Sequence, residues 1–297
     1  MTNRLFLFAA FDKFQHVDST LMRFLNALSK LGDIAFVMDN ELPDAEISKL
    51  KSVPNIKHIN AARHNEYDFG SYKRGYVWAR DNDLLDNYDW VYLVNDSVFG
   101  PVTDLEPVLV KMENRSPDFF GMVENVSPEY PKHIQSWFVG LSKRVAVSNV
   151  FNDFICGVKQ EQEKIIVIYK YEIRLSVVLA QNGFSCDAVY HDGIDVNILN
   201  NPWRVLDGGV PFLKKQSFNY NDNVLSLYQF LSNDWLSEVF AYTKTYGIWE
   251  TNTVSDSVYK KVFRMSLFGI PIVTLRRKRN QWKAYLFDFI PVMKISL

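Results

Sequence analysis

The sequence has few cysteines and no long apolar segment. Only two of its 297 residues are cysteines, Cys156 and Cys186, and they lack metal-ligand spacing. A single pair in a chain this long is typical of a reducing compartment. The first apolar run, Leu5 to Phe11, is too short for a signal-peptide core, and no later run reaches the roughly 18 apolar residues that span a bilayer. We therefore expect a cytoplasmic chain whose membrane contact is peripheral.

Two other features are missing. The formal net charge of −1 gives no overall positive field, so nucleic acid is not an expected partner. No Gly-x-Gly-x-x-Gly follows the first apolar run, which disfavours a dinucleotide-dependent oxidoreductase. The sequence also lacks the Gly-x-Ser-x-Gly motif of nucleophilic hydrolases, so it gives no support for a hydrolase of that kind. With 47% apolar and 15% aromatic residues, the chain can instead bury one full core and some additional structure.

Strand-like and helix-like patterns alternate along the first half of the chain. Apolar strands are predicted at 5–10, 34–38, 56–59 and 90–94, with helices at 19–31, 45–50 and 71–83. This alternation predicts an α/β fold with a mostly parallel, Rossmann-type sheet flanked by helices. Ligands of such sheets bind beyond the carboxyl ends of the strands. The residues to inspect are therefore 11–12, 39–40 and 95–97.

The second half is less regular. A helix is predicted at 171–182, with Gly183 as its C-terminal cap, followed by a short strand at 188–190. Residues 200–215 contain two prolines and two glycines and are predicted to form an ordered loop. Apolar residues at helical spacing within 223–245 predict two closing helices.

The C-terminal residues are basic and partly apolar. From Lys260 to Leu297 there are nine Lys or Arg and one acid, Asp288. Apolar segments at 267–273 and 286–293 flank the basic run at 276–279. An anionic membrane surface would retain such a tail through apolar insertion and about 1 kcal/mol per basic residue. A basic β-hairpin on the domain, or an oligomer contact, is the alternative.

Asp96 is the first candidate for chemistry. It follows an apolar strand and precedes a Gly100-Pro101 turn, so it is predicted at the ligand edge of the sheet. A carboxylate there can bind a ribose hydroxyl, or a divalent cation that neutralises a diphosphate leaving group. An aspartate that only caps the turn explains the residue equally well.

A second cluster, residues 65–75, is dense in polar and aromatic side chains and contains two glycines. It stands at the start of a predicted helix, where a ligand can approach closely. Asp68 or Ser71 could also be a helix cap, but a cap would explain one residue and not the cluster.

Several separated blocks give a more specific signal. They are Asp68 to Tyr72, Leu93 to Pro101, Asp118 to Gly121, His133 to Phe138, Asn201 to Trp203 and Gly209 to Lys215. In this order and spacing, over residues 5–218, the sequence resembles the rhamnan synthesis protein F family. The resemblance implies a GT-A-like glycosyltransferase of bacterial surface polysaccharide, such as O-antigen of lipopolysaccharide, rhamnan or capsule. Implied partners are a nucleotide-diphosphate sugar, a lipid-linked glycan acceptor and other assembly glycosyltransferases.

The donor implied by the resemblance is rhamnose on dTDP, or a hexose on UDP. The residues expected to bind it are Phe11, Asp12, Asp68, Ser71, Tyr72, Lys73, Asn95, Asp96, Ser97 and Lys214. In GT-A enzymes an Asp-x-Asp motif coordinates Mg²⁺ or Mn²⁺, and Asn95-Asp96-Ser97 departs from it because only the middle residue is acidic. Asp96 and His191 are the candidate metal ligands, and Lys214, Lys73 or Arg74 could supply the charge instead.

By likeness to inverting GT-A enzymes, Glu172 is the candidate base, although an exposed glutamate paired with Lys170 or Arg174 would look the same. The residues expected to contact the acceptor are His133, Gln135, Trp137, His191 and Asp192. Trp137 could equally belong to the core, and a histidine at a strand end is often only hydrogen-bonded.

These expectations divide the chain into a catalytic domain at 1–218, closing helices at 219–258 and a membrane-association tail at 259–297. The alternative to an enzyme is a catalytically inactive sugar-binding or scaffolding subunit, which the missing acid at Asn95 favours.

Overall fold

The structure is a computed structural model that describes residues 2–127, 130–191, 202–219 and 231–246, together with four strand segments at 260–267, 270–278, 281–286 and 290–296. It divides into two compact units, Met1–Tyr242 and Thr243–Leu297, and each is considered by itself.

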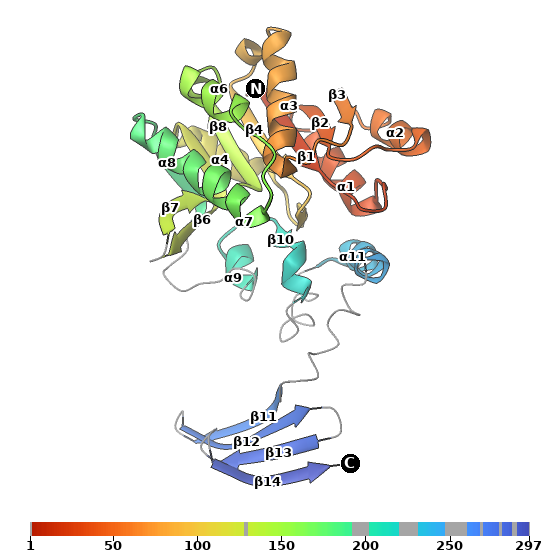
Figure 1. The fold of residues 1–297 in the computed structure, drawn as a ribbon, viewed down its shortest axis with the longest axis vertical. Helices are drawn as coiled ribbons and strands as arrows, with labels where there is room; N and C mark the ends of the chain where they lie inside the picture. Colours follow the sequence, from red (N-terminus) through yellow and green to blue (C-terminus); the bar gives the residue numbers. More distant parts are fainter. Residues whose placement is uncertain are drawn as a thin grey trace. The chain divides into compact units, whose positions relative to one another are not determined.

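The first unit is built on a mixed sheet, eight-stranded in the described residues, with the order β3-β2-β1-β4-β8-β6-β7 and β9 beside β6 (Figure 1). Its strands are β1 (Arg4–Ala10), β2 (Asp33–Met38), β3 (Ile56–Ala61), β4 (Trp90–Asn95), β6 (Phe119–Ser127), β7 (Tyr130–Ile134), β8 (Phe138–Ser142) and β9 (Cys186–His191). β3, β2, β1 and β4 are mutually parallel, whereas β8 is antiparallel to β4. The predicted α/β fold with a mostly parallel sheet is confirmed.

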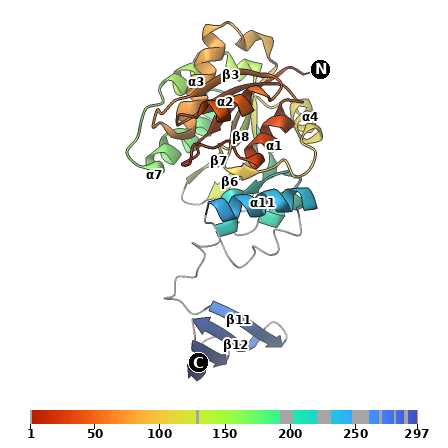
Figure 2. The same cartoon turned by 90° about the vertical axis from the view of Figure 1, so that its right-hand side faces the viewer.

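Helices cover both faces of this sheet (Figures 1 and 2). They are α1 (Ser19–Leu28), α2 (Asp44–Lys51), α3 (Tyr67–Asp81), α4 (Glu106–Asn114), α5 (Lys143–Ala146), α6 (Asn149–Cys156), α7 (Lys164–Val167), α8 (Arg174–Gln181), α9 (Pro202–Asp207) and α11 (Asn233–Thr245), with 3₁₀ turns at Leu85–Asn87 and Lys215–Asn219.

Alternate residues of β1 enter two separate cores because successive side chains of a strand point to opposite faces. Phe6 and Phe8 pack in one core with Phe24 of α1, and Leu7 packs in the other with Tyr76 of α3. A parallel strand buried on both faces reads as a continuous apolar run, which is why this strand was predictable.

The region predicted as a loop at 200–215 is more ordered than expected. Pro202 begins α9, because proline suits the first turn of a helix, where its missing N–H is not needed. Leu213–Lys214 form β10, which pairs antiparallel with β5 (Val98–Phe99). Of the two predicted closing helices, α11 is described, and residues 220–230 lie outside the described residues. Gly183 follows α8 with a φ of +79°, as predicted for a C-terminal cap.

The predicted helix at 171–182 is longer and irregular. It begins with α7, passes through a π-helical turn at Ile168–Ile173 and continues as α8. π-helical turns are rare and often occur at functional sites. Glu172 lies within this turn.

The second unit contains a four-stranded antiparallel sheet, β11 (Lys260–Leu267), β12 (Ile270–Lys278), β13 (Gln281–Leu286) and β14 (Ile290–Ser296), in that order. The basic tail therefore forms a sheet in its described residues. In the described part of the chain, no helix combines the length and apolar character needed to cross a bilayer.

Candidate active site

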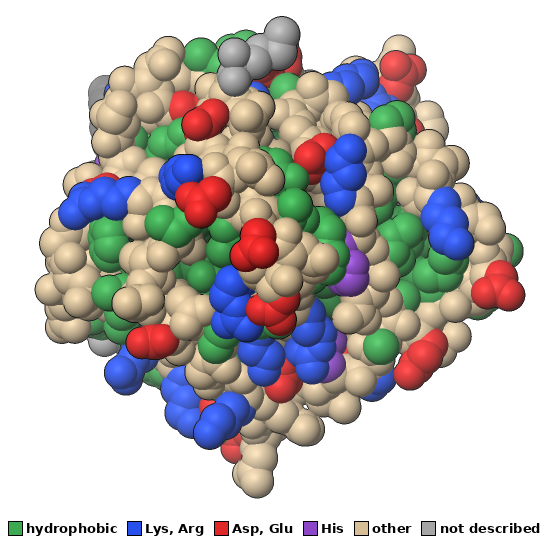
Figure 3. Space-filling view, turned by 90° about the horizontal axis from the view of Figure 1, so that it is seen from above, with side chains coloured by type: hydrophobic (Ala, Val, Ile, Leu, Met, Phe, Trp, Pro, Cys, Tyr) green, Lys and Arg blue, Asp and Glu red, His purple; other side chains and the backbone are tan. Residues whose placement is uncertain are grey.

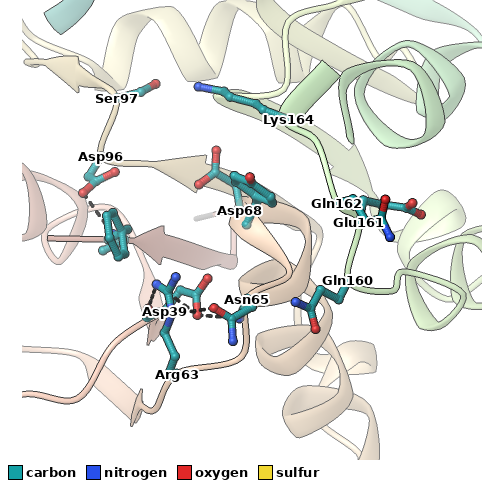
Figure 4. Close-up of a pocket in the computed structure, with 13 residues that line it drawn as sticks. Asp39, Arg63, Asn65, Asp68, Asp96, Ser97, Gln160, Glu161, Gln162 and Lys164 are labelled. Atoms are coloured by element: carbon teal, nitrogen blue, oxygen red, sulfur yellow. Dashed lines mark hydrogen bonds and ion pairs between the residues drawn. The ribbon is translucent and has the colours of Figure 1, made fainter. Parts of the chain in front are cut away.

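A pocket of about 490 Å³ opens at the carboxyl edge of the four parallel strands (Figure 4). Phe11 follows β1, Asp39 follows β2, Arg63 follows β3 and Asp96 follows β4, so each strand contributes to one cavity. The complete lining is Ala10, Phe11, Asp39, Arg63, Asn65, Tyr67, Asp68, Asp96, Ser97, Gln160, Glu161, Gln162 and Lys164. Its position is where ligands of open α/β sheets bind.

Asp96 is fixed against the end of β1. The backbone N–H of Phe11 donates to its Oδ2 at 3.2 Å, and its own N–H donates to the Ala9 carbonyl. Burial raises the pKa of Asp96 to about 7; the Asp68 charge adds to this shift and Lys215 opposes it. The carboxylate is therefore set to change charge near neutral pH.

Asn95 links Asp68 to Ser97. Its Nδ2 donates to Asp68 Oδ2 at 2.8 Å, and its Oδ1 accepts from the Ser97 hydroxyl at 2.6 Å and from the Ser97 N–H at 3.1 Å. An aspartate at position 95 would lose the donor and face Asp68, a buried carboxyl whose pKa is already raised by burial. The departure from Asp-x-Asp thus has a structural cause.

Two lysines bring positive charge to these acids. The pairing of β10 with β5 places Lys214 so that its Nζ donates to Ser97 Oγ at 3.2 Å and lies 5.2 Å from the Trp137 ring centre. Burial lowers the pKa of Lys214 to about 8, against the opposing effects of Glu172 and Asp68. Lys164 reaches from α7 toward Ser97 (Figure 4), and its charge also acts on Asp68.

The other end of the pocket combines an aromatic ring, a cation and a carboxylate. The Arg63 guanidinium lies 5.1 Å from the ring centre of Phe11, which is 48% exposed. Asp39 Oδ1 accepts from the N–H groups of His64 at 2.7 Å and Asn65 at 2.9 Å. Such a group suits a nucleobase and its ribose. Arg63 was not predicted as a site residue, although it follows a parallel strand as Phe11, Asp39 and Asp96 do.

Three of the residues expected at the acceptor, His133, Gln135 and Trp137, lie in β7 or between β7 and β8. Glu172 Oε2 accepts from the hydroxyl of Ser136, and Glu172 acts electrostatically on Asp68 and Lys214. His133 is 3% exposed. Trp137 is buried and its Nε1 donates to Gln135 Oε1 at 2.9 Å.

Three predicted donor residues of α3 are engaged away from the pocket lining. The Ser71 hydroxyl is 3.0 Å from His64 Nε2, and the buried Tyr72 hydroxyl donates to the Ser136 carbonyl. Lys73 Nζ pairs with Glu66 and donates to the Val158 carbonyl at 2.7 Å. These three residues are close to Asp68 in the sequence, but the helical geometry of α3 directs their side chains toward neighbouring elements and not into the pocket.

Asp12 shapes the loop after β1, since its Oδ1 accepts from the N–H of Phe14 at 2.6 Å. His191 pairs with Glu124 at 3.0 Å and Asp187 at 3.2 Å, and it is not among the pocket residues. Asp192 lies outside the described residues.

For a metal ion, the residues that fit are Asp96 and Asp68. In the described segments, no group of three or more His, Cys, Asp or Glu side chains is placed to hold a metal. Mg²⁺, however, is often bound by one or two carboxylates together with the phosphates of a substrate. Both carboxylates belong to the same pocket, whereas His191 is engaged elsewhere.

The chain shows similarity to known proteins in sequence and in structure. Over 178 residues the chain is 25% identical to y4gN, an uncharacterized protein of Sinorhizobium fredii, covering 59% of this chain and 45% of that protein, so it spans about half the length of this relative. Among solved structures it is similar to core-mannan synthase A (CmsA/Ktr4) of Aspergillus fumigatus in its Mn/GDP form, with 11% identity and a TM-score of 0.35 over 60% of this chain and 70% of that one. It is also similar to the mannosyltransferase Ktr4p of S. cerevisiae, with 12% identity and a TM-score of 0.33 over 60% of this chain and 65% of that one.

The remaining comparison is with families. Residues 34–256, most of the chain, match rhamnan synthesis protein F, which agrees with the resemblance seen in the separated sequence blocks. The chain belongs to the rhamnan synthesis protein F family.

Proposed function

We propose that this chain is a glycosyltransferase that moves a sugar from a nucleotide-diphosphate donor to a bacterial surface polysaccharide. The observation that carries the proposal is a pocket at the edge of the parallel strands, with Phe11 and Arg63 suited to a nucleobase at one end and Asp68, Asp96 and Lys164 at the other. Membership in the rhamnan synthesis protein F family supports a polysaccharide as the acceptor.

The donor fits the pocket in one direction. The base lies against Phe11 and Arg63, and a ribose hydroxyl reaches Asp39. The diphosphate then extends toward Asp96, with Lys164 and Lys214 nearby. Cations placed where charge develops on the departing phosphate lower the barrier to transfer.

Glu172 takes the proton from the attacking hydroxyl of the acceptor. Its electrostatic coupling to Asp68 and Lys214 supports a position beside the sugar end of the donor. Asp96 and Asp68 would hold a Mg²⁺ or Mn²⁺ ion, which would neutralise part of the leaving-group charge. The hydrogen bond from Asn95 to Asp68 gives the missing acid a structural reason that is compatible with an active enzyme.

Rhamnose from dTDP-rhamnose is the donor that the family description favours, with a UDP-hexose as the alternative. The acceptor is then a lipid-linked or growing glycan of an O-antigen, rhamnan or capsule, handled together with other assembly glycosyltransferases.

The C-terminal sheet supports attachment to the inner face of the cytoplasmic membrane. Its register pairs Lys261 with Arg276, Arg276 with Lys283, and Lys283 with Lys294. Directly paired residues share a face, so four basic residues form one row across four strands. An anionic lipid surface would attract such a concentration of basic residues.

Thermal unfolding of the purified chain with a series of nucleotide sugars tests the proposal, because a ligand that binds the folded state raises the midpoint. We expect one donor to stabilise the chain, the free nucleoside diphosphate to do so as well, and Asp39→Ala to remove both effects. No stabilisation by any nucleotide sugar, with or without Mn²⁺, would contradict it.

A further inference from the structure

The carboxylate of Glu172 is held at one oxygen only. The hydroxyl and N–H of Ser136 both donate to Oε2, the N–H at 3.4 Å. Oε1 lies 3.9 Å from His133 Nε2 and accepts no hydrogen bond from the residues that the structure describes. The Glu172 side chain is 25% exposed and that of His133 only 3%. Among the described residues, Oε1 is therefore the Glu172 oxygen left to accept from a substrate hydroxyl, and His133 is its neighbour.

The orientation of His133 fixes which nitrogen faces Glu172. Its Nδ1 lies 2.8 Å from the Pro131 carbonyl, which can only accept, so Nδ1 carries the hydrogen of the neutral ring. Nε2, which lies 3.9 Å from Glu172 Oε1, then carries the lone pair. That lone pair gives no hydrogen bond to an ionised carboxylate, but it can accept one from a protonated carboxyl group once the 3.9 Å separation shortens.

Neighbouring elements are hydrogen-bonded to the segments that carry Ser136 and Glu172. The Tyr72 hydroxyl of α3 donates to the Ser136 carbonyl at 3.0 Å. The Ile134 N–H donates to the Ser176 hydroxyl of α8 at 3.0 Å, which ties β7 to the helix that follows Glu172. Functional groups need such support to keep a productive geometry.

We propose that Ser136 and His133 are positioning residues that act through Glu172. Ser136 fixes Oε2 so that Oε1 meets the acceptor hydroxyl, and His133 Nε2 accepts a hydrogen bond from Oε1 after that oxygen has taken the proton. In the step, the acceptor O–H bond breaks and its oxygen bonds to the sugar carbon. The bond from that carbon to the diphosphate breaks with its electron pair on the leaving phosphate. The inference rests on the proposed glycosyl transfer.

Two substitutions of His133 separate its two nitrogens. His133→Asn retains a donor for Pro131 but removes Nε2, whereas His133→Gln places an amide oxygen near the Nε2 position. We expect His133→Asn to lower kcat on the order of 10-fold with the donor KM unchanged, the scale for residues that support a functional group. His133→Gln retains most of kcat. Equal losses in both variants would indicate a purely structural role and overturn the proposal.

Ser136 is tested in the same way. Ser136→Ala lowers kcat with the donor KM unchanged, and Ser136→Thr, which keeps the hydroxyl, restores it. Failure of threonine to restore kcat in a folded variant would contradict the role of the hydroxyl.

A measurement without sugar transfer tests the geometry itself. In ¹⁵N-histidine spectra of the full chain, we expect the neutral His133 ring to carry its proton on Nδ1. Glu172→Gln supplies an amide donor and should shift the Nε2 signal while leaving Nδ1 in place. A proton on Nε2, or no response to Glu172→Gln, would overturn the proposal. If this response is present but no sugar is transferred, the proposed function fails and the positioning role fails with it.

Discussion

Asp96 and Lys214 are the two groups of the site whose charge changes near neutral pH. Burial raises the pKa of Asp96 to about 7 and lowers that of Lys214 to about 8. Asp96 gains its negative charge as the pH rises through the first value, and Lys214 loses its positive charge as the pH rises through the second. Transfer that needs both charges is therefore confined to a narrow range.

We predict a bell-shaped pH profile of kcat/KM with limbs near the pKa values of about 7 and about 8. Lys214→Arg should move the alkaline limb upward, because arginine stays charged. Asp96→Ala should abolish transfer without unfolding the chain. A flat profile for the wild-type protein, or near-normal turnover by Asp96→Ala, would remove these residues from the mechanism.

Asp96 also predicts a dependence of stability on pH. The folded state keeps the Asp96 proton to about pH 7, above the ordinary value of 3.8, so ionisation of this carboxyl costs stability as the pH rises between these values. Asp96→Asn, which can still accept from Phe11, should raise the thermal midpoint near pH 8 but not near pH 4. An equal change in the thermal midpoint at both pH values would show that burial does not raise the pKa of Asp96.

At the scale of elements, a buried ion pair joins β1, β4 and α4 at the end of the sheet away from the pocket. Arg4 forms two contacts of 2.6 Å with Glu113, and the Tyr92 hydroxyl donates to the same carboxylate at 2.6 Å. Both charged side chains are nearly fully buried, at 6% and 5% exposure. Removing one partner leaves an uncompensated charge in the core.

Arg4→Met should therefore destabilise the chain by about 3–5 kcal/mol, measured by urea unfolding. The double variant Arg4→Met, Glu113→Leu should recover much of this loss, because neither charge then remains buried. If Arg4→Met lowers the free energy of unfolding by less than about 1 kcal/mol, the effect is that of a solvent-exposed ion pair. This result would contradict a buried Arg4–Glu113 pair.

The elements differ in how far the sequence predicts them. The buried parallel strands and α1 follow from apolar periodicity, which local sequence carries. The short strand β10 does not, because Leu213–Lys214 become a strand only through pairing with residues more than a hundred positions earlier. The π-helical turn holding Glu172 is likewise set by packing, since Tyr171 and Ile173 on either side of Glu172 in the sequence are both buried.

The same distinction applies to the site. Asp96 and Asp68 were predictable from their place after a strand and at a helix start, whereas Lys164 and Gln160 reach the pocket from a segment without any motif. Tyr72 and Lys73 show the converse, since proximity in sequence to Asp68 does not decide which face of α3 they occupy.

At the scale of the whole molecule, charge is distributed unevenly between the two units. On the face seen in Figure 3, basic and acidic side chains are interspersed. The strands at 260–296 are strongly basic by comparison, with one row of four basic residues on one face of the sheet. Any electrostatic attraction to lipid is therefore expected from the C-terminal unit.

A matched pair of double variants tests this attraction. Lys261→Glu with Arg276→Glu reverses two charges of the row, whereas Lys260→Glu with Arg277→Glu reverses two charges on the opposite face. We expect the first pair to lose binding to vesicles containing phosphatidylserine and the second pair to retain most of it, with wild-type binding weakening as salt rises. Equal losses would indicate an effect of net charge alone and contradict a lipid-facing row.

The central claim, that this chain transfers a sugar from a nucleotide donor, is tested most directly by following labelled sugar from nucleotide-diphosphate donors into glycan of bacterial membranes. Wild-type protein should incorporate label from one preferred donor, and Glu172→Gln should bind that donor but incorporate label at least about 10²-fold more slowly, the scale for a positioned base. Donor binding without incorporation by the wild-type protein would identify a sugar-nucleotide-binding subunit instead, and incorporation unaffected by Glu172→Gln would contradict the assigned base.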